Sequence, residues 1–321
     1  MIQTRLTRTL GLEHPVILAP MAGVAGGALA AAVSRAGGLG LIGGGYCDGG
    51  WIADQFAAAG NEQVGCGFIT WRLAGSPELL EAVLARKPRA VFLSFGEVEP
   101  FAAQVKAAGV PLICQVQTLA AAEAALEAGA DVIVAQGGEA GGHGAQRATL
   151  TLVPEVSDML AARAPGTPLV AAGGIADGRG LAAALMLGAD GILLGTRLWA
   201  SAEALVPEGQ VAAGLKATGD QTLRTRAVDV VRDLPWPAPY DIRVLGNSFT
   251  DRWHDDLEGL RKAAPTEGPR WQKAFAAGDA AVGNPVVGEG IGLIRDRLPA
   301  EDIIKALVGE ARALLDGGWQ R

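Results

Sequence analysis

Short apolar runs alternate with longer alanine-rich stretches through residue 200 of the chain. A short continuous apolar run bounded by turn residues is typical of a buried strand, whereas apolar positions spaced three or four residues apart indicate a helix. On this basis strands are expected at residues 16–19, 39–42, 64–69, 90–94, 112–115, 132–135, 169–172 and 192–194, with helices between them. The alternation predicts a parallel sheet whose outer side is covered by helices.

The ends of the expected helices repeat one pattern, in which an alanine-rich stretch is followed by glycine, a short turn and an apolar run. Residues 36–42, 108–113, 128–134 and 187–194 all show this pattern. Glycine supplies the left-handed residue that ends a helix. Eight strand–helix units are the number that closes a barrel, so the predicted fold is an α/β (β/α)₈ TIM barrel. A doubly wound open sheet is the alternative.

The pattern changes after the eighth expected strand. Residues 201–285 are richer in charge and tryptophan and include the stiff segment Pro-Trp-Pro-Ala-Pro-Tyr at 235–240. We expect a mainly helical insertion here, acting as a lid or as an interface. An amphipathic helix near residues 300–315 then returns the chain to the barrel, which would comprise residues 1–200 and 286–321. At least one of Trp236, Tyr240, Phe249 and Trp253 is expected to roof the pocket, the alternative being that they pack the insertion's own core.

Composition and charge exclude several classes of function. A net charge of −7 over 321 residues, with no basic cluster, argues against a nucleic-acid partner. The most apolar region, residues 21–45, is interrupted by Arg35 and by glycines, so no membrane span is expected. Cys47, Cys66 and Cys114 lie far apart, and no signal-peptide core follows Arg5 and Arg8. A cytoplasmic protein with free thiols is expected.

Glycine-rich segments follow the expected strands where the active site of a barrel lies. Residues 136–144 carry His143 among glycines, and residues 172–178 and 195–197 follow strands seven and eight, whose loops commonly hold phosphate in this fold. Glycine bares backbone N–H groups, and histidine exchanges a proton near neutral pH. Glycines that merely allow tight turns, with a surface histidine among them, are the alternative.

The residue types missing from the strand ends narrow the chemistry. No lysine ends a strand, so Schiff-base chemistry lacks its nucleophile, and no histidine or carboxylate cluster has metal-ligand spacing. Gln115 and Gln136 end strands five and six, where carboxamides could bind a ring or serve a structural role. The cavity would then contain phosphate-binding loops, carboxamides and one histidine. Such a set suits a phosphorylated redox cofactor that supplies the reactivity itself.

Four motifs in order at the strand ends resemble the nitronate monooxygenase family, formerly called 2-nitropropane dioxygenases. They are Ala-Pro-Met-Ala-Gly at 19–23, Gln-Gly-Gly-Glu-Ala-Gly-Gly-His at 136–143, Ala-Ala-Gly-Gly-Ile-Ala-Asp-Gly at 171–178 and Gly-Thr-Arg at 195–197. The resemblance covers residues 15–200 and resumes near 288–315. It implies an FMN-dependent barrel that oxidises alkyl nitronates with O₂ to a carbonyl compound and nitrite.

The resemblance also implies roles for individual residues. His143 takes the family's catalytic position. The flavin ring would contact Ala19, Pro20 and Met21, and the strand-end amides Gln115 and Gln136 would approach it. The phosphate and ribityl chain would be bound by Gly141, Gly142, Gly173, Gly174, Gly195 and Thr196, or these residues would pack beside it. Gly67 and Gly290 depart from the family, which often has polar residues there.

Two further functions share this scaffold. One is an NAD(P)H-dependent reductase of quinones or of enoyl groups on acyl carrier protein, and the other is a flavin-binding protein without turnover. The partners expected are a small-molecule substrate and O₂, and a homodimer is left open.

Overall fold

Eight parallel strands form a barrel. This computed structural model describes residues 2–317. The barrel strands are β1 (Val16–Leu18), β2 (Leu41–Gly45), β3 (Gly65–Ile69), β4 (Val91–Ser94), β5 (Leu112–Val116), β6 (Val132–Gln136), β8 (Leu169–Ala172) and β9 (Gly191–Leu194). Each overlaps an expected strand, because each is a buried apolar run that pairs on both sides.

The sheet closes between its first two strands. Its order is β1-β9-β8-β6-β5-β4-β3-β2, and a parallel bridge joins Ile17 of β1 to Leu39, just before β2. The Leu18 N–H donates to the Leu39 carbonyl at 2.9 Å, and the Leu39 N–H donates to the Val16 carbonyl at 3.0 Å. The predicted (β/α)₈ barrel is therefore confirmed, and the doubly wound alternative is wrong.

Helices cover the outer side of the barrel and end where glycine permits. They are α2 (Gly27–Arg35), α3 (Gly49–Ala59), α4 (Thr70–Leu73), α5 (Glu78–Leu84), α6 (Glu99–Ala107), α7 (Leu119–Glu127), α8 (Thr149–Arg163), α9 (Gly178–Met186) and α10 (Thr196–Trp199). Beyond α7 and α9, Gly129 and Gly188 take φ values of +87° and +94°, which side chains disfavour. This confirms the repeat in which glycine ends a helix before each turn.

Two apolar cores hold the barrel. One lies between the strands and the surrounding helices, and the other fills the barrel interior. The interior core includes Leu6, Leu10 and Leu12 from α1 (Arg5–Leu10) and the turn after it, so the N-terminal helix packs into the barrel with the inward strand residues. With its interior filled, the barrel is a solid scaffold, and space for a ligand lies at the strand ends.

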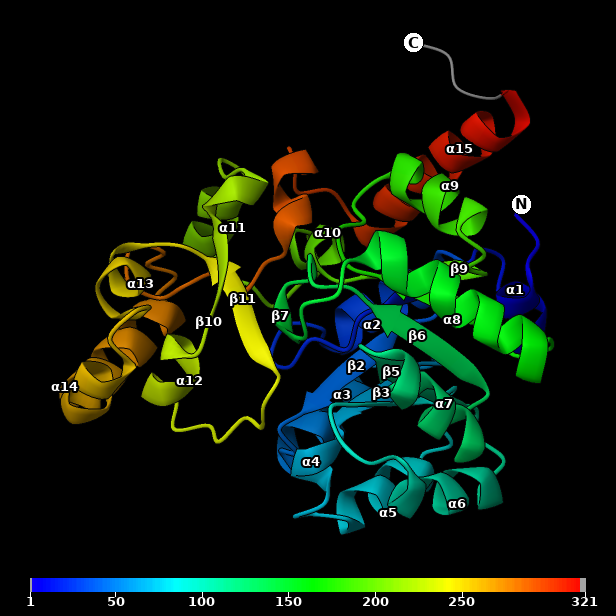
Figure 1. The fold of residues 1–321 in the computed structure, drawn as a ribbon, viewed down its shortest axis with the longest axis horizontal. Coiled ribbons are helices and arrows are strands. Elements are labelled where there is room, and N and C mark those ends of the chain that lie inside the picture. The colour runs from blue at the N-terminus through cyan, green and yellow to red at the C-terminus, as the bar shows by residue number, and fades with distance from the viewer. Residues whose placement is uncertain (1, 318–321) are drawn as a thin grey trace.

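Residues 201–285 contain helices together with two strands that the sequence analysis did not predict. The elements are α11 (Glu208–Gly214), η1 (Gly219–Gln221), β10 (Thr222–Thr225), α12 (Ala227–Val231), β11 (Asp241–Leu245), α13 (Ser248–Trp253) and α14 (Leu257–Ala276). In Figure 1 most of them lie to one side of the barrel. They have a core of their own, which includes Phe249, Trp253 and Trp271. The division of the chain into barrel and insertion stays a prediction.

A small sheet joins the insertion to the barrel. Its order is β10-β11-β7, and β7 (Gly142–Gly144) belongs to the loop that follows β6. The chain then passes through η2 (Glu289–Leu293) to α15 (Ala300–Gly317), which packs against α9 and α2. The expected final helix is thus present. Within residues 2–317, no helix combines the length and apolar character that crossing a bilayer requires.

Candidate active site

A cavity of about 440 Å³ opens at the carboxyl ends of the barrel strands. Ligand pockets commonly have volumes of roughly 300–1,000 Å³. Every cofactor or catalytic residue expected from the sequence lines this cavity: Ala19, Pro20, Met21, Gln115, Gln136, Gly141, Gly142, His143, Gly173, Gly174, Gly195 and Thr196. The structure therefore brings the whole predicted set together, although the role of each residue stays a prediction.

The loop after β1 lies tightly over neighbouring strands. A Cβ added to Gly67 in β3 would come within 2.4 Å of the Pro20 ring, and one added to Gly43 in β2 would come within 2.2 Å of the Met21 carbonyl oxygen. Side chains at these two positions would push Pro20 and Met21 away from the barrel. In this chain, glycine at position 67, where the family often has a polar residue, is therefore explained by close packing against Pro20.

Glycines along the rim leave space beside the backbone. At Gly142, Gly195 and Gly290 an added Cβ would meet no atom closer than 3.6 Å, so packing alone does not require glycine there. Gly173 and Gly174 take φ values of +103° and +73° at the end of β8. We call Gly142, Gly195 and Gly290 the cradle. Gly195 directly follows β9, and Gly290 lies beside Gly174, which follows β8. These are the eighth and seventh barrel strands, whose loops commonly hold phosphate in this fold.

The two strand-end glutamines have different surroundings. The Gln115 carboxamide, in a residue only 9% exposed, makes no hydrogen bond within residues 2–317 and faces the cavity. Buried polar groups usually have partners, so a bound molecule is the expected one. Gln136 is already engaged, because its Oε1 accepts from Gln117 Nε2 at 2.8 Å and its Nε2 donates to the His143 carbonyl at 3.2 Å. A cofactor role for Gln136 would have to use its remaining hydrogen-bonding capacity.

His143 lies in a strand and is buried, so the alternative of a surface histidine in a glycine-rich turn is wrong. It is the central residue of β7, where it pairs with Ile242 of β11, and it is 7% exposed. The correction has a long-range cause. The glycine-rich run is extended enough to accept a neighbouring strand, and that strand comes from the insertion.

Asp229 and Trp236 of the insertion contact the His143 ring. Both carboxylate oxygens of Asp229 lie 3.0 Å from His143 Nε2, and both side chains are buried. The Trp236 ring stacks on the imidazole with 3.4 Å between ring centroids and 10° between planes. Burial lowers the pKa of His143, Asp229 raises it in part, and the cations Arg232 and Arg224 lower it further. The net direction is downward, so the neutral imidazole predominates at pH 7.

Trp236 also anchors an aromatic cluster over the strand ends. It makes edge contacts with Tyr46, Trp71 and Phe95 at centroid distances of 6.4, 5.5 and 5.2 Å, and its Nε1–H donates to the Tyr46 hydroxyl at 3.2 Å. Trp236 lines the cavity, as expected for at least one aromatic residue of the insertion. Phe249 and Trp253 instead pack in the insertion's own core.

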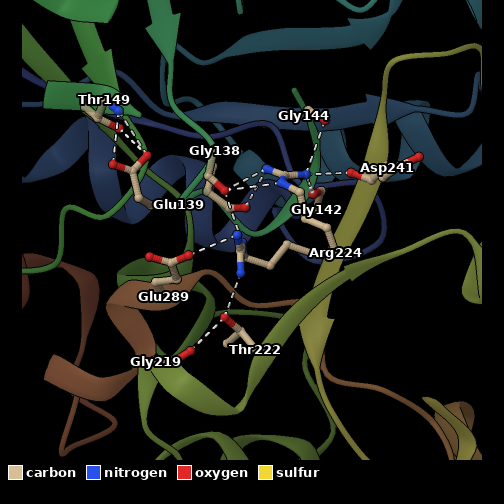
Figure 2. Close-up of polar contacts among 12 residues, drawn as sticks. Gly138, Glu139, Gly142, Gly144, Thr149, Gly219, Thr222, Arg224, Asp241 and Glu289 are labelled. Carbon is tan, nitrogen blue, oxygen red and sulfur yellow. Dashed lines mark hydrogen bonds and ion pairs between the residues drawn. The ribbon is translucent and has the colours of Figure 1, made fainter. Parts of the chain in front are cut away.

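Two arginines from the insertion donate hydrogen bonds to the loop that carries His143, as Figure 2 shows for Arg224. The Arg224 guanidinium donates to the carbonyl oxygens of Gly138 at 2.9 Å, Gly144 at 3.2 Å and Asp241 at 2.6 Å. Arg243 also donates to the Gly138 carbonyl, at 3.1 Å, and pairs with Glu289 at 2.9 Å. The carbonyl groups of this loop are thereby fixed toward the insertion.

Glu139, the one carboxylate in the same loop, is engaged elsewhere. Its oxygens accept from the Thr149 backbone N–H at 3.0 Å and from the Thr149 hydroxyl at 2.8 Å, at the start of α8 (Figure 2).

Arg232 lines the cavity, stacks over Tyr46 at 5.2 Å and forms no ion pair within the described chain. The cavity thus contains a cation available to an anionic ligand. No group of three potential metal ligands occurs in residues 2–317.

Sequence reasoning missed Asp229, Arg224 and Arg232. They lie far from the glycine motifs along the chain; His143 and Asp229 are 86 residues apart. One signal was present, because Asp229 is the single charged residue in the apolar run of α12 (Ala-Val-Asp-Val-Val). A lone carboxylate in such a run indicates burial with a partner.

Comparisons with known proteins show the family of this chain. A sequence model described as nitronate monooxygenase matches residues 3–66 and 73–310. The nitronate monooxygenase npaC of Metarhizium robertsii is 37% identical over 336 residues, covering 94% of this chain and 91% of that protein. FabK from Thermotoga maritima has a TM-score of 0.84 at 30% identity and 98% coverage of both chains. A nitroalkane oxidase from Streptomyces ansochromogenes has a TM-score of 0.77 at 27% identity, covering 97% of this chain and 100% of that one. The similarities include the insertion as well as the barrel.

Proposed function

Because the chain belongs to the nitronate monooxygenase family, we propose that this enzyme uses FMN to oxidise alkyl nitronates with O₂ to a carbonyl compound and nitrite. The observation that carries the proposal is the position of His143. Among the side chains that line the cavity, His143 is the one whose ordinary pKa lies near neutrality. It lines the same cavity as the cradle and the unpartnered Gln115 carboxamide.

The residues of the cavity fit FMN. The cradle of Gly142, Gly195 and Gly290 has room for a phosphate and ribityl chain, and the Gln115 carboxamide offers a donor and an acceptor to a ring. Pro20 and Met21 form a flat wall that Gly67 and Gly43 allow to lie close to the barrel. Bound FMN would supply the electron transfer between nitronate and O₂, for which the protein has no group of its own.

His143 would serve the neutral form of the substrate. A nitronate arrives already deprotonated, whereas a neutral nitroalkane must first lose a proton from carbon. The pKa of His143 is lowered by burial, so the imidazole is neutral and can accept that proton at pH 7. Glu139 is held by Thr149 and does not compete for this role. Arg232 would attract the anionic form.

A reductase that uses NAD(P)H, with a quinone or an enoyl thioester as acceptor, is the second candidate. The observation that favours it is again Arg232, since an unpaired cation lining the cavity suits a nucleotide phosphate as well as a nitronate. A flavin-binding protein without turnover is the third candidate, and the cavity offers it no specific support.

Anaerobic mixing of the flavin-loaded protein with ethyl nitronate and, separately, with NADH distinguishes the candidates. We expect the nitronate to bleach the flavin absorbance rapidly and NADH to leave it unchanged. With air admitted, nitrite should accumulate in proportion to the nitronate consumed. Rapid bleaching by NADH alone would establish the reductase instead, and no bleaching by either would leave only the binding protein.

A further inference from the structure

We propose that Asp229 is a positioning residue that holds the proton of neutral His143 on Nε2, so that Nδ1 presents its lone pair to the cavity. The inference deepens the proposed function and rests on it for its effect on turnover. It assigns a role to a residue of the insertion that lies in none of the glycine motifs.

The first argument is the isolation of the Asp229 carboxylate. Its residue is 5% exposed, and the sole hydrogen-bond partner of the side chain within residues 2–317 is His143 Nε2. An ionised carboxylate can only accept hydrogen bonds. If Nε2 carried a lone pair instead of a proton, two acceptors would face each other at 3.0 Å in a buried site. That arrangement is strongly unfavourable for a buried charge, so the Nε2–H tautomer is favoured.

The second argument is the direction of the other ring nitrogen. His143 Nδ1 has no hydrogen-bond partner in the described chain, and it is not among the enclosed unpaired atoms. The His143 side chain lines the cavity, so Nδ1 is the nitrogen that a substrate can reach. Trp236 covers one face of the ring, and Gln136 holds the His143 backbone carbonyl. These contacts hold the residue with Nε2 toward Asp229.

The charges around the ring support the same assignment. Asp229 of α12 is the anion in contact with the His143 ring, whereas Arg232, just beyond α12, and Arg224 of β10 act on it as cations. Burial raises the pKa of Tyr46, so its hydroxyl is neutral near pH 7. When His143 accepts a proton, the resulting imidazolium therefore faces the Asp229 carboxylate across Nε2. Without Asp229 the imidazolium would lose this counter-charge, and the pKa of His143 would fall further.

The proton step balances with these groups alone. The Nδ1 lone pair takes the proton from the carbon that bears the nitro group. The electron pair of the broken C–H bond moves into the C–N bond and onto the nitro oxygens, giving the nitronate anion. His143 becomes an imidazolium with protons on both nitrogens, and no proton passes to Asp229. This division of labour, in which a buried carboxylate orients a histidine without taking its proton, is known from other enzymes.

The tautomer can be measured directly on the resting holoenzyme. The chain has three histidines, so a sample labelled with ¹⁵N-histidine gives a spectrum simple enough to assign with the His143→Asn variant. We expect the His143 signals at pH 7 to show a protonated Nε2 and an unprotonated Nδ1. A proton on Nδ1 in the wild-type protein would overturn the proposal, and this measurement requires no variant of Asp229 to fold.

Asp229→Asn tests the consequence for turnover. Asparagine is nearly the same size, but its amide can donate to Nε2 and thereby shift the histidine proton to Nδ1. We expect a loss of about 10²–10⁴ in kcat for neutral nitroethane, with much smaller change for preformed ethyl nitronate. On the acidic limb of the profile of kcat/KM against pH, the apparent pKa of the base should also move to lower pH. The matched control is Asp233→Asn, which removes the same charge from an exposed residue of the same segment at φ +52°, a conformation that asparagine tolerates.

The outcomes separate the two proposals. Equal losses with both substrate forms, or no loss with either, would contradict the role of Asp229 while leaving nitronate oxidation intact. If the wild-type protein turned over neither form, the proposed function would fail. The ¹⁵N spectrum would then still decide whether Asp229 sets the tautomer.

Discussion

Replacing Arg224 by methionine tests whether the insertion holds the loop that carries His143. The Arg224 guanidinium bonds to backbone carbonyl oxygens on both sides of His143 and to that of Asp241, and it forms no ion pair within residues 2–317. Methionine preserves much of the apolar stem and removes every donor. The loop would then depend on Arg243 and on its pairing with β11.

The magnitude follows from two opposing contributions. Burial lowers the pKa of Arg224 from 12.5 to about 10, which corresponds to a cost of about 3 kcal/mol for holding the cation at pH 7. Hydrogen bonds from a charged donor contribute about 1.5–3 kcal/mol each, so the three shortest contribute about 5–9 kcal/mol. The difference predicts that Arg224→Met lowers the free energy of unfolding by about 2–6 kcal/mol.

Urea denaturation measures this loss, and hydrogen-exchange mass spectrometry locates it. We expect faster exchange in the peptide spanning residues 138–144 before any change in the barrel strands. Arg226→Met is the control, because Arg226 is an exposed neighbour whose ion pair with Asp241 at 2.7 Å contributes about 1 kcal/mol at most. If the two variants unfolded alike and the loop exchanged as in the wild type, the idea that Arg224 holds this loop would be refuted.

The remaining predictions concern the cofactor, the roof and the wall of the cavity. Heat release and chromatography of the purified protein should yield FMN, and recovery of FAD or of no flavin would contradict the fit of the cradle. Trp236→Ala should raise KM for the substrate. Phe249→Ala, in the insertion's core, should lower the free energy of unfolding by about 3–5 kcal/mol and leave KM unchanged. The reverse pattern would show that Trp236 does not cover the substrate. The side chain of Gly67→Asn should collide with Pro20, lower the free energy of unfolding by about 1–3 kcal/mol and weaken FMN retention. Unchanged thermal stability and FMN retention would contradict this steric explanation.

The barrel could be predicted from the sequence because its signals are local. Each strand is a buried apolar run, and the turns before β6 and β9 contain Gly129 and Gly188 where the backbone is left-handed. The ends of the strands also fix where the cavity lies, so the glycines and His143 could be placed together without knowledge of the structure.

The surroundings of His143 could not be predicted because they depend on pairing across the chain. β10 is short and polar, with the sequence Thr-Leu-Arg-Thr, and β7 is the glycine-flanked tripeptide that contains His143 itself. Neither has a strand pattern in isolation; both become strands by pairing with β11, where Ile242 and Val244 point inward on either side of Arg243. The same pairing brings Asp229 and Trp236 to the imidazole, so the burial of His143 follows from the insertion.

The most direct test of His143 as a base compares two substrate forms on one flavin-replete variant, His143→Asn. We expect kcat for neutral nitroethane to fall by about 10²–10⁴, while kcat for preformed ethyl nitronate changes by about tenfold or less. The reason is that the nitronate arrives without the proton that His143 would remove. Equal losses with both forms would show that His143 binds the anion and is not the base, and unchanged rates with both would show that the reaction does not use His143.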